Sequence, residues 1–269
     1  FGSAVCAYGA SDGPDIKGQA AIVDCASTNE VLWQKNSDKK MNLASITKLM
    51  TCLIAIEKLG LNEKVTVKQS AVDAARLAQS EAWNIAGEEL TVEELVYEAM
   101  LVSSNDAAIT LAAAVSGSEK KFVKLMNKRA EEIGCTNTNF TNASGIEEKN
   151  HYSTAADVVK IAKEALSNKE LLRIAGTSKY ILPKTNKSES RDLENSNYFL
   201  EGGKAKIDPS GNTVSVKKYK GVFGGKTGTT LARKATMVVG CEFDGLDVYV
   251  AVLDSTVAKR YADVKKLLD

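Results

Sequence analysis

The order of strand-like and helix-like segments constrains this chain's fold more than any other feature of its sequence. Near the start, Gln19–Cys25 and Glu30–Gln34 are β-rich runs separated by polar turn residues, which predicts a hairpin. Near the end, Thr236–Phe243 and Leu246–Asp254 flank Asp244-Gly245, a dipeptide typical of tight hairpin turns. Strands are therefore expected at both ends of the chain, and helices between them.

Two further segments complete the expected sheet layer. The run around Lys226 adds a strand before the last hairpin, and a helix from about Val257 to Leu268 closes the chain. The economical fold is α/β (α+β), a five-stranded antiparallel sheet built from both termini with an inserted helical subdomain. We expect the sheet subdomain over about 1–43 plus 168–269 and the helical subdomain over about 44–167. A cleft between them is the preferred place for a site.

Capping signals mark the expected helices. A helix from Leu43 is apolar around most of its circumference, which predicts burial in a core, and a long helical stretch should follow it. Thr91 and Glu94 form a capping box for a helix to about Leu101. After an interruption at 103–106, a helix resumes over 107–115, and Ser118 and Thr154 should cap two more. Residues 183–215 are polar and contain two prolines, so an extended loop is expected there.

A serine and a lysine three residues apart occur four times, at Ser37/Lys40, Ser45/Lys48, Ser118/Lys121 and Ser215/Lys218. Only Ser45/Lys48 opens the strongly apolar helix, where the two residues share one face. Burial and the positive helix end both lower a lysine pKa, so Lys48 could take the proton of Ser45. The alternative is an N-cap serine beside a lysine that extends to solvent.

Two other motifs strengthen the nucleophile hypothesis. Ser103-Ser104-Asn105 interrupts a helix, and Lys226-Thr227-Gly228 occurs once, in a run of small residues. A serine-lysine pair, a serine-asparagine pair and Lys-Thr-Gly together are the three motifs of β-lactamases and penicillin-binding proteins. Their chemistry is acyl transfer through a serine ester.

Composition excludes several other classes of function. The 269 residues carry a net charge of +1, which implies no nucleic acid partner. No run approaches the roughly 18 apolar residues of a membrane span. One histidine and five dispersed cysteines offer no metal cluster, so neither a metal nor another cofactor is expected. A disulfide between Cys6 and Cys25 stays open, while Cys25, Cys52 and Cys241 lie in apolar contexts typical of buried thiols.

From about residue 18 to its end, the chain resembles a D-alanyl-D-alanine carboxypeptidase of the low-molecular-mass penicillin-binding protein group, within the β-lactamase and DD-peptidase superfamily. The three motifs carry the resemblance, with support from residues 140–145 and 151–155. It implies a β-lactamase/transpeptidase-like fold and one DD-peptidase catalytic domain over 1–269. It also implies peptidoglycan stem peptides as substrate, β-lactam antibiotics as covalent inhibitors, and an extracytoplasmic location. Membrane attachment would require a segment absent from this chain.

The resemblance also implies roles for matching residues. Ser45 would be the nucleophile and Lys48 its base, with Ser103 relaying a proton and Asn105 binding the substrate amide. The other implied site residues are Lys226 for positive potential, Thr227 for the substrate carboxylate, the Ser45 and Thr229 amides for the oxyanion, and Gly228, Ser80 and Arg260 at the substrate site. A solvated helix charge is the alternative for Arg260, and His151 is expected to be structural.

Some segments depart from the family pattern. Residues 231–235 replace a usual Ala-Gly pair, Ser196 stands where an arginine is usual, and residues 201–214 lengthen the approach to Lys226. Two other functions stay open, a serine β-lactamase and a non-catalytic peptidoglycan-binding module. The Glu-x-x-Leu-Asn pattern of class A β-lactamases is not found between Asn105 and Lys226. The sequence does not distinguish carboxypeptidase, endopeptidase and transpeptidase turnover.

Overall fold

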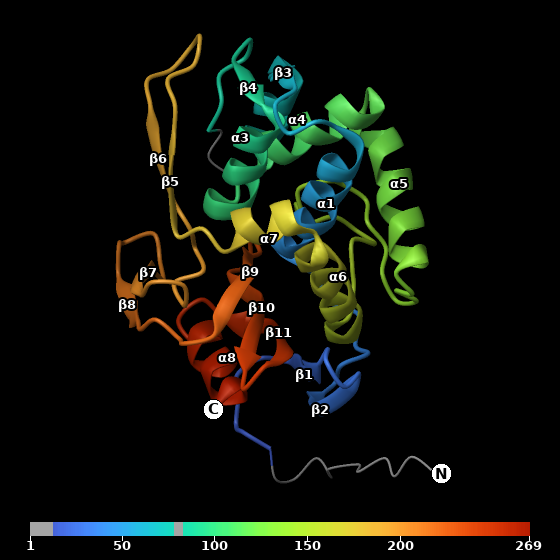
Figure 1. The fold of residues 1–269 in the computed structure, drawn as a ribbon, viewed down its shortest axis with the longest axis vertical. Coiled ribbons are helices and arrows are strands. Elements are labelled where there is room, and N and C mark those ends of the chain that lie inside the picture. The colour runs from blue at the N-terminus through green and yellow to red at the C-terminus, as the bar shows by residue number, and fades with distance from the viewer. Residues whose placement is uncertain (1–12, 78–82) are drawn as a thin grey trace.

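The central layer is an antiparallel sheet with the strand order β2-β1-β11-β10-β9 (Figure 1). The structure, a computed structural model, describes residues 13–77 and 83–269. The five strands are β1 (Ala20–Cys25), β2 (Glu30–Lys35), β9 (Val222–Thr229), β10 (Lys234–Phe243) and β11 (Leu246–Thr256).

The two ends of the chain meet in the middle of this sheet. Ala20 of β1 lies opposite Leu253 of β11, and this antiparallel pairing continues to Cys25 and Val248. The β10–β11 turn is formed by Asp244 and Gly245, both with positive φ, as a tight hairpin requires. The predicted fold, a five-stranded antiparallel sheet built from both termini, is confirmed.

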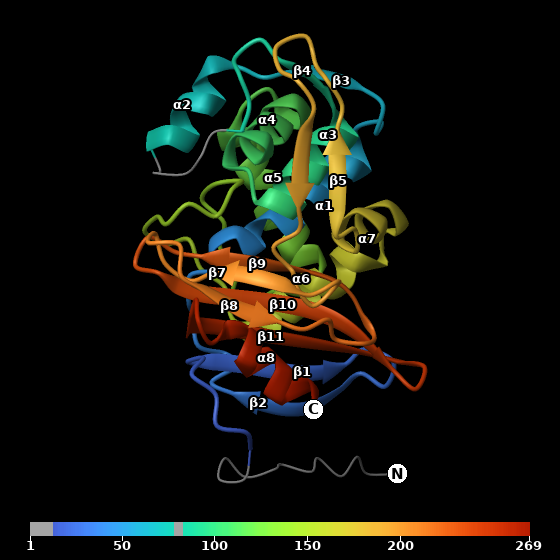
Figure 2. The same cartoon turned by 90° about the vertical axis from the view of Figure 1, so that its left-hand side faces the viewer.

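Helices cover both faces of the sheet. Figure 2 shows α8 (Arg260–Leu268) against one face and the helical region beyond the β9 edge. The other helical elements are η1 (Ala44–Thr47), α1 (Lys48–Lys58), α2 (Gln69–Leu77), α3 (Val92–Tyr97), η2 (Glu98–Val102), α4 (Asn105–Ser116), α5 (Glu119–Glu132), α6 (Ala155–Ser167) and α7 (Lys169–Ala175). No helix in the described part of the chain combines the length and the apolar character needed to cross a bilayer.

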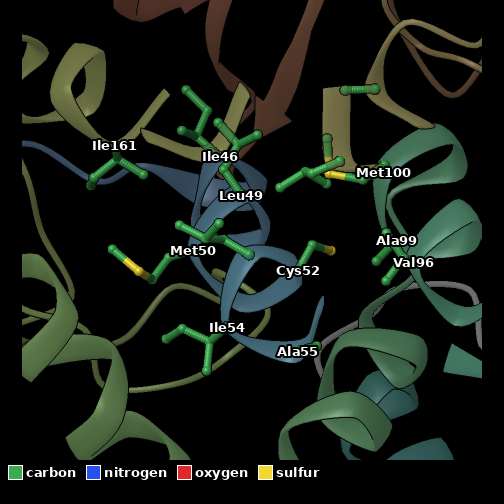
Figure 3. Packing of buried hydrophobic residues seen from close by; sticks show 14 of the residues in the cluster. Ile46, Leu49, Met50, Cys52, Ile54, Ala55, Val96, Ala99, Met100 and Ile161 are labelled. Atoms are coloured by element: carbon green, nitrogen blue, oxygen red, sulfur yellow. The ribbon is translucent and has the colours of Figure 1, made fainter. Parts of the chain in front are cut away.

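Helix α1 is the centre of the larger core. Its residues are buried from Lys48 to Ala55, as the apolar circumference predicted. Figure 3 shows Leu49 and Met50 among neighbouring apolar side chains, with Cys52 directed toward Met100 and Ala99. The motif-bearing segments therefore lie on rigid, closely packed elements.

The expected caps are present. Thr91 and Glu94 form the capping box of α3, and the side chains of Ser118 and Thr154 accept hydrogen bonds from the first turns of α5 and α6. Gly117 ends α4 with positive φ. The predicted helix to Leu101 differs in its last turn, because η2 is a π-helix and not an α-helix.

Two expectations are wrong. Residues 183–215 are not one extended loop, because β6 (Arg191–Glu194) pairs with β5 (Lys179–Leu182), and β7 (Gly203–Lys206) pairs with β8 (Thr213–Val216). Each of these strands is only four residues long, so its apolar positions form too short a pattern to stand out in a polar segment. The long helical stretch after α1 is also interrupted by the pairing of β3 (Lys64–Thr66) with β4 (Glu89–Thr91).

Candidate functional site

Ser45 lies in η1, at the base of a cleft of about 550 Å³ between the sheet edge and the helical region. The backbone before it is tightly held, since Ala44 has a φ of 48°. The cleft is lined by Ser45, Ser103, Asn105, Gly145, Ile146, Glu147, Pro209, Thr229, Thr230, Leu231 and Arg233. Ser45 and the Ser103–Asn105 motif thus line one opening together with Thr229, which directly follows the Lys-Thr-Gly motif.

Lys48 is fully buried beneath Ser45. Its Nζ lies 3.0 Å from Ser45 Oγ, 2.6 Å from Asn105 Oδ1 and 2.6 Å from the carbonyl oxygen of Ser144. Burial lowers its pKa well below the ordinary lysine value, and the nearby Lys226 lowers it further. The alternative of a lysine that extends to solvent is wrong, because the side chain is 0% exposed.

The Ser103 motif is held in an unusual backbone conformation. Ser103 ends η2 with φ 63° and ψ 32°, the left-handed region that non-glycine residues rarely occupy. Ser104 caps α4, and Asn105 begins that helix facing Lys48. The π-turn and the left-handed residue together direct the motif toward the cleft.

The Lys226 strand passes close to the Ser45 backbone. A methyl group on Gly228 would lie 3.0 Å from Ser45 N and 2.9 Å from Leu43 O, so glycine allows this approach. Lys226 is buried, and its Nζ donates to the carbonyl oxygen of Thr227 at 3.0 Å. Burial, together with Arg260, lowers the pKa of Lys226 to about 7.

Thr227 and Arg260 are buried near Thr229, which lines the cleft. Because side chains alternate along a strand, Thr227 faces away from Lys226, and its Oγ1 is 2.7 Å from Ser196 Oγ. Arg260 donates to Gly228 O and to Thr229 Oγ1, each at 3.1 Å. The solvated-charge alternative for Arg260 is wrong, since the residue is 7% exposed.

His151 is buried away from Ser45. Its Nδ1 accepts a hydrogen bond from Thr141 N at 3.1 Å, so Nε2 carries the proton and donates to Thr47 Oγ1 at 2.8 Å. These contacts join two loops to η1. Burial lowers the pKa of His151 to about 4.

This low pKa predicts a stability change with pH. The folded protein keeps His151 neutral, whereas the unfolded chain protonates it near 6.5. The contribution of neutral His151 to the free energy of unfolding is therefore complete above pH 6.5. It is lost as the pH falls toward 4, and the loss amounts to about 3 kcal/mol. Urea unfolding at pH 7 and 4.5, in wild type and His151→Gln, measures it. An equal pH dependence in both proteins would contradict the prediction.

Sequence reasoning assigned no site role to several residues that shape the cleft. Ser144 acts through its backbone carbonyl, and Gly145 has a φ of +85° beside Ala44 O, where a side chain would overlap. Pro209 and Arg233 come from segments interpreted only as departures from the family. A backbone contact leaves no signature in side-chain type, although the glycine was a usable signal.

Two residues singled out in the sequence, Ser80 and Cys6, lie outside the described residues. Cys25, Cys52 and Cys241 are buried as expected. Within the described ranges, no group of three metal-ligating side chains occurs.

The fold and the cluster of Ser45, Lys48, Ser103 and Asn105 match the arrangement of motifs that β-lactamases and penicillin-binding proteins share. The chain belongs to the D-alanyl-D-alanine carboxypeptidase family, peptidase S11, whose sequence model matches residues 8–257. It is 34% identical over 257 residues to D-alanyl-D-alanine carboxypeptidase DacF of Bacillus subtilis, and 31% identical over 253 residues to a D-alanyl-D-alanine carboxypeptidase of Streptomyces sp. strain K15. The predicted family is confirmed.

Solved structures agree with this membership. A mutant of the Streptomyces K15 DD-transpeptidase superposes with a TM-score of 0.84 at 28% identity, covering 95% of this chain and 97% of that one. A D-alanyl-D-alanine carboxypeptidase from Mycobacterium tuberculosis gives 0.82 at 26% identity, covering 97% and 93%. The sequence matches cover 93% of this chain but 61% of DacF, and 90% of this chain with 82% of the Streptomyces relative.

Proposed function

We propose that this protein is a serine D-Ala-D-Ala carboxypeptidase that removes the terminal D-alanine from peptidoglycan stem peptides. The observation that carries the proposal is the environment of Lys48. Asn105 Oδ1 and Ser144 O can only accept hydrogen bonds, so a neutral amine gives them its two hydrogens. Its lone pair is then directed at the Ser45 hydroxyl, 3.0 Å away.

Acylation follows from this arrangement. Lys48 takes the proton of Ser45 as Oγ attacks the penultimate D-alanine carbonyl, forming a tetrahedral oxyanion. The amides of Ser45 and Thr229 stabilise that charge, each contributing roughly 3–4 kcal/mol. The C–N bond then breaks, and the proton passes through Ser103 to the departing amine, so that D-alanine leaves and Lys48 is neutral again.

Deacylation uses the same groups in reverse. The departed D-alanine opens a path for water, and Lys48 takes a proton from that water as it attacks the ester. Ser45 Oγ leaves with the proton that Lys48 returns.

Asn105 would hold the substrate amide, while Lys226, Thr227 and Arg260 would attract its terminal carboxylate.

The same proposal places the protein outside the cytoplasm, where peptidoglycan is found, secreted or attached to the outer face of the membrane. A net charge of +1 gives no basis for nucleic acid binding. The domain assignment of 1–269, with sheet subdomain about 1–43 plus 168–269 and helical subdomain about 44–167, is part of this proposal. Labelling with a fluorescent penicillin tests the proposed acyl transfer at Ser45. The non-catalytic alternative, a peptidoglycan-binding module, predicts no covalent label.

The β-lactam ester at Ser45 is expected to be long-lived. After ring opening, the leaving group stays tethered and occupies the approach that water needs. Among the described cleft-lining residues, Glu147 is the one carboxylate, and it is exposed on the rim. No buried carboxylate among these lining residues is therefore placed to aim a water at the ester, as the glutamate of class A β-lactamases does.

Nitrocefin hydrolysis measures this prediction. We expect far fewer turnovers than about 10 per second, an ordinary enzyme rate. Turnover at that rate or faster would favour the serine β-lactamase alternative. Glu147→Gln would then show whether the rim carboxylate supplies the base.

A further inference from the structure

Two buried carboxylates enclose the Ser103–Asn105 segment, Glu98 before it and Asp106 after it, each 0% exposed. The backbone amides of Ser103 and Ser104 both donate to the carbonyl oxygen of Glu98. The Asp106 carboxylate accepts from Ser104 Oγ and from Ala107 N. The conformation of the motif therefore depends on where these two acidic residues lie.

Asn84 connects the two carboxylates. Its side-chain Nδ2 donates to Glu98 Oε2 at 2.7 Å, and its backbone N–H donates to Asp106 Oδ2 at 2.8 Å. Asn84 is 3% exposed and belongs to a segment before β4. One residue thus contacts the acidic side chains on both sides of the motif.

Arg191 of the β5–β6 hairpin supports the same bridge. Its NH2 lies 3.2 Å from Glu98 Oε1 and 2.9 Å from Glu88 Oε1, and 3.4 Å from Asn84 Oδ1. Its NH1 donates to the carbonyl oxygen of Trp83. Figure 2 shows this hairpin alongside the helical region. Leu182 and Leu193 of the hairpin are buried in the larger apolar core, which holds Arg191 beside these acidic side chains.

We propose that Asn84 is a positioning residue for the acyl transfer, an inference that rests on the proposed function of Ser45 and Lys48. Left-handed backbone at a residue such as Ser103 costs about 1–3 kcal/mol and persists only when the surroundings enforce it. Without the bridge, Ser103 would relax and Asn105 would move from Lys48, which it contacts at 2.6 Å. Asn84 acts through both residues and contacts neither Ser45 nor substrate.

Asn84→Ala tests the bridge, because it removes the Glu98 contact and keeps the backbone N–H to Asp106. The matched control is Asn127→Ala, which removes an amide that joins α5 to Phe140 through bonds of 2.9 and 2.8 Å. We expect penicillin acylation to slow by about 10–100-fold in Asn84→Ala, as for a misplaced catalytic group. Asn127→Ala should stay within about threefold, since it touches no part of the motif.

A double-mutant cycle with Ser103→Ala separates positioning from general destabilisation. If Asn84 acts through Ser103, the slowing of acylation caused by Asn84→Ala should be at least several-fold smaller in the Ser103→Ala protein than in the wild type. Additive effects of the two substitutions, or a wild-type acylation rate in Asn84→Ala, would overturn the inference about Asn84. The proposed function would still stand in that case, provided that the wild-type protein is labelled by penicillin. Failure of wild type to label would reject the proposed function itself. If Asn84→Ala does not fold, Asn84→Ser replaces it; failure of both to fold would assign Asn84 to stability and overturn the inference.

Discussion

Ser45→Ala is expected to abolish the covalent penicillin adduct and to lower carboxypeptidase turnover by about 10⁴-fold or more. Ser45 Oγ lies at the base of the cleft, 3.0 Å from the buried amine of Lys48. Removing the nucleophile leaves the oxyanion donors in place but no atom to form the ester. Intact-mass analysis after exposure to penicillin measures the adduct directly.

A second serine-lysine pair provides the control for this substitution. Ser118 also precedes a lysine by three residues, but its side chain caps α5. Ser118→Ala should lose about 1 kcal/mol of stability and keep the adduct. A retained adduct in Ser45→Ala would show that another residue is the nucleophile.

Lys48→Ala is expected to slow acylation by about 10³–10⁴-fold while the protein stays folded. The Lys48 Nζ lies 3.0 Å from Ser45 Oγ, and burial favours its neutral form, which can accept a proton. Stopped-flow measurement of penicillin acylation gives the rate constant. Circular dichroism establishes that the variant is folded.

Lys48→Arg distinguishes whether Lys48 acts by accepting a proton or only by its positive charge. Arginine keeps a positive group near Ser45 but stays protonated, so it cannot accept the serine proton. Both variants should be impaired if Lys48 is the base. A Lys48→Ala protein that acylates within tenfold of wild type would assign the base elsewhere, and Lys226, with a pKa of about 7, would be the first residue to test.

The elements predicted well from sequence are those with strong local signals. The Asp244-Gly245 turn, the caps at Thr91, Ser118 and Thr154, and the apolar circumference of α1 each have one dominant physical cause. The burial of Lys48 followed from that circumference. Local chemistry was sufficient for these elements because tertiary contacts reinforce the same choice.

The elements that escaped prediction depend on tertiary contacts. The β5–β6 hairpin is short, and its place depends on Leu182 and Leu193 packing into the core and on Arg191 meeting buried acidic side chains far away in sequence. The π-turn at Glu98–Val102 continues a helical pattern and gives no separate signal. The Ser144 carbonyl contributes a backbone atom, which side-chain motifs cannot reveal.

The most direct test of the account is mass spectrometry of the products formed from a pentapeptide ending in D-Ala-D-Ala. The wild-type protein should release one D-alanine and leave a tetrapeptide, and Ser45→Ala should leave the pentapeptide intact. An added amine acceptor would show how far transpeptidation competes with hydrolysis. Cleavage at a different bond, no cleavage by the wild type, or equal cleavage by Ser45→Ala would contradict the proposed function.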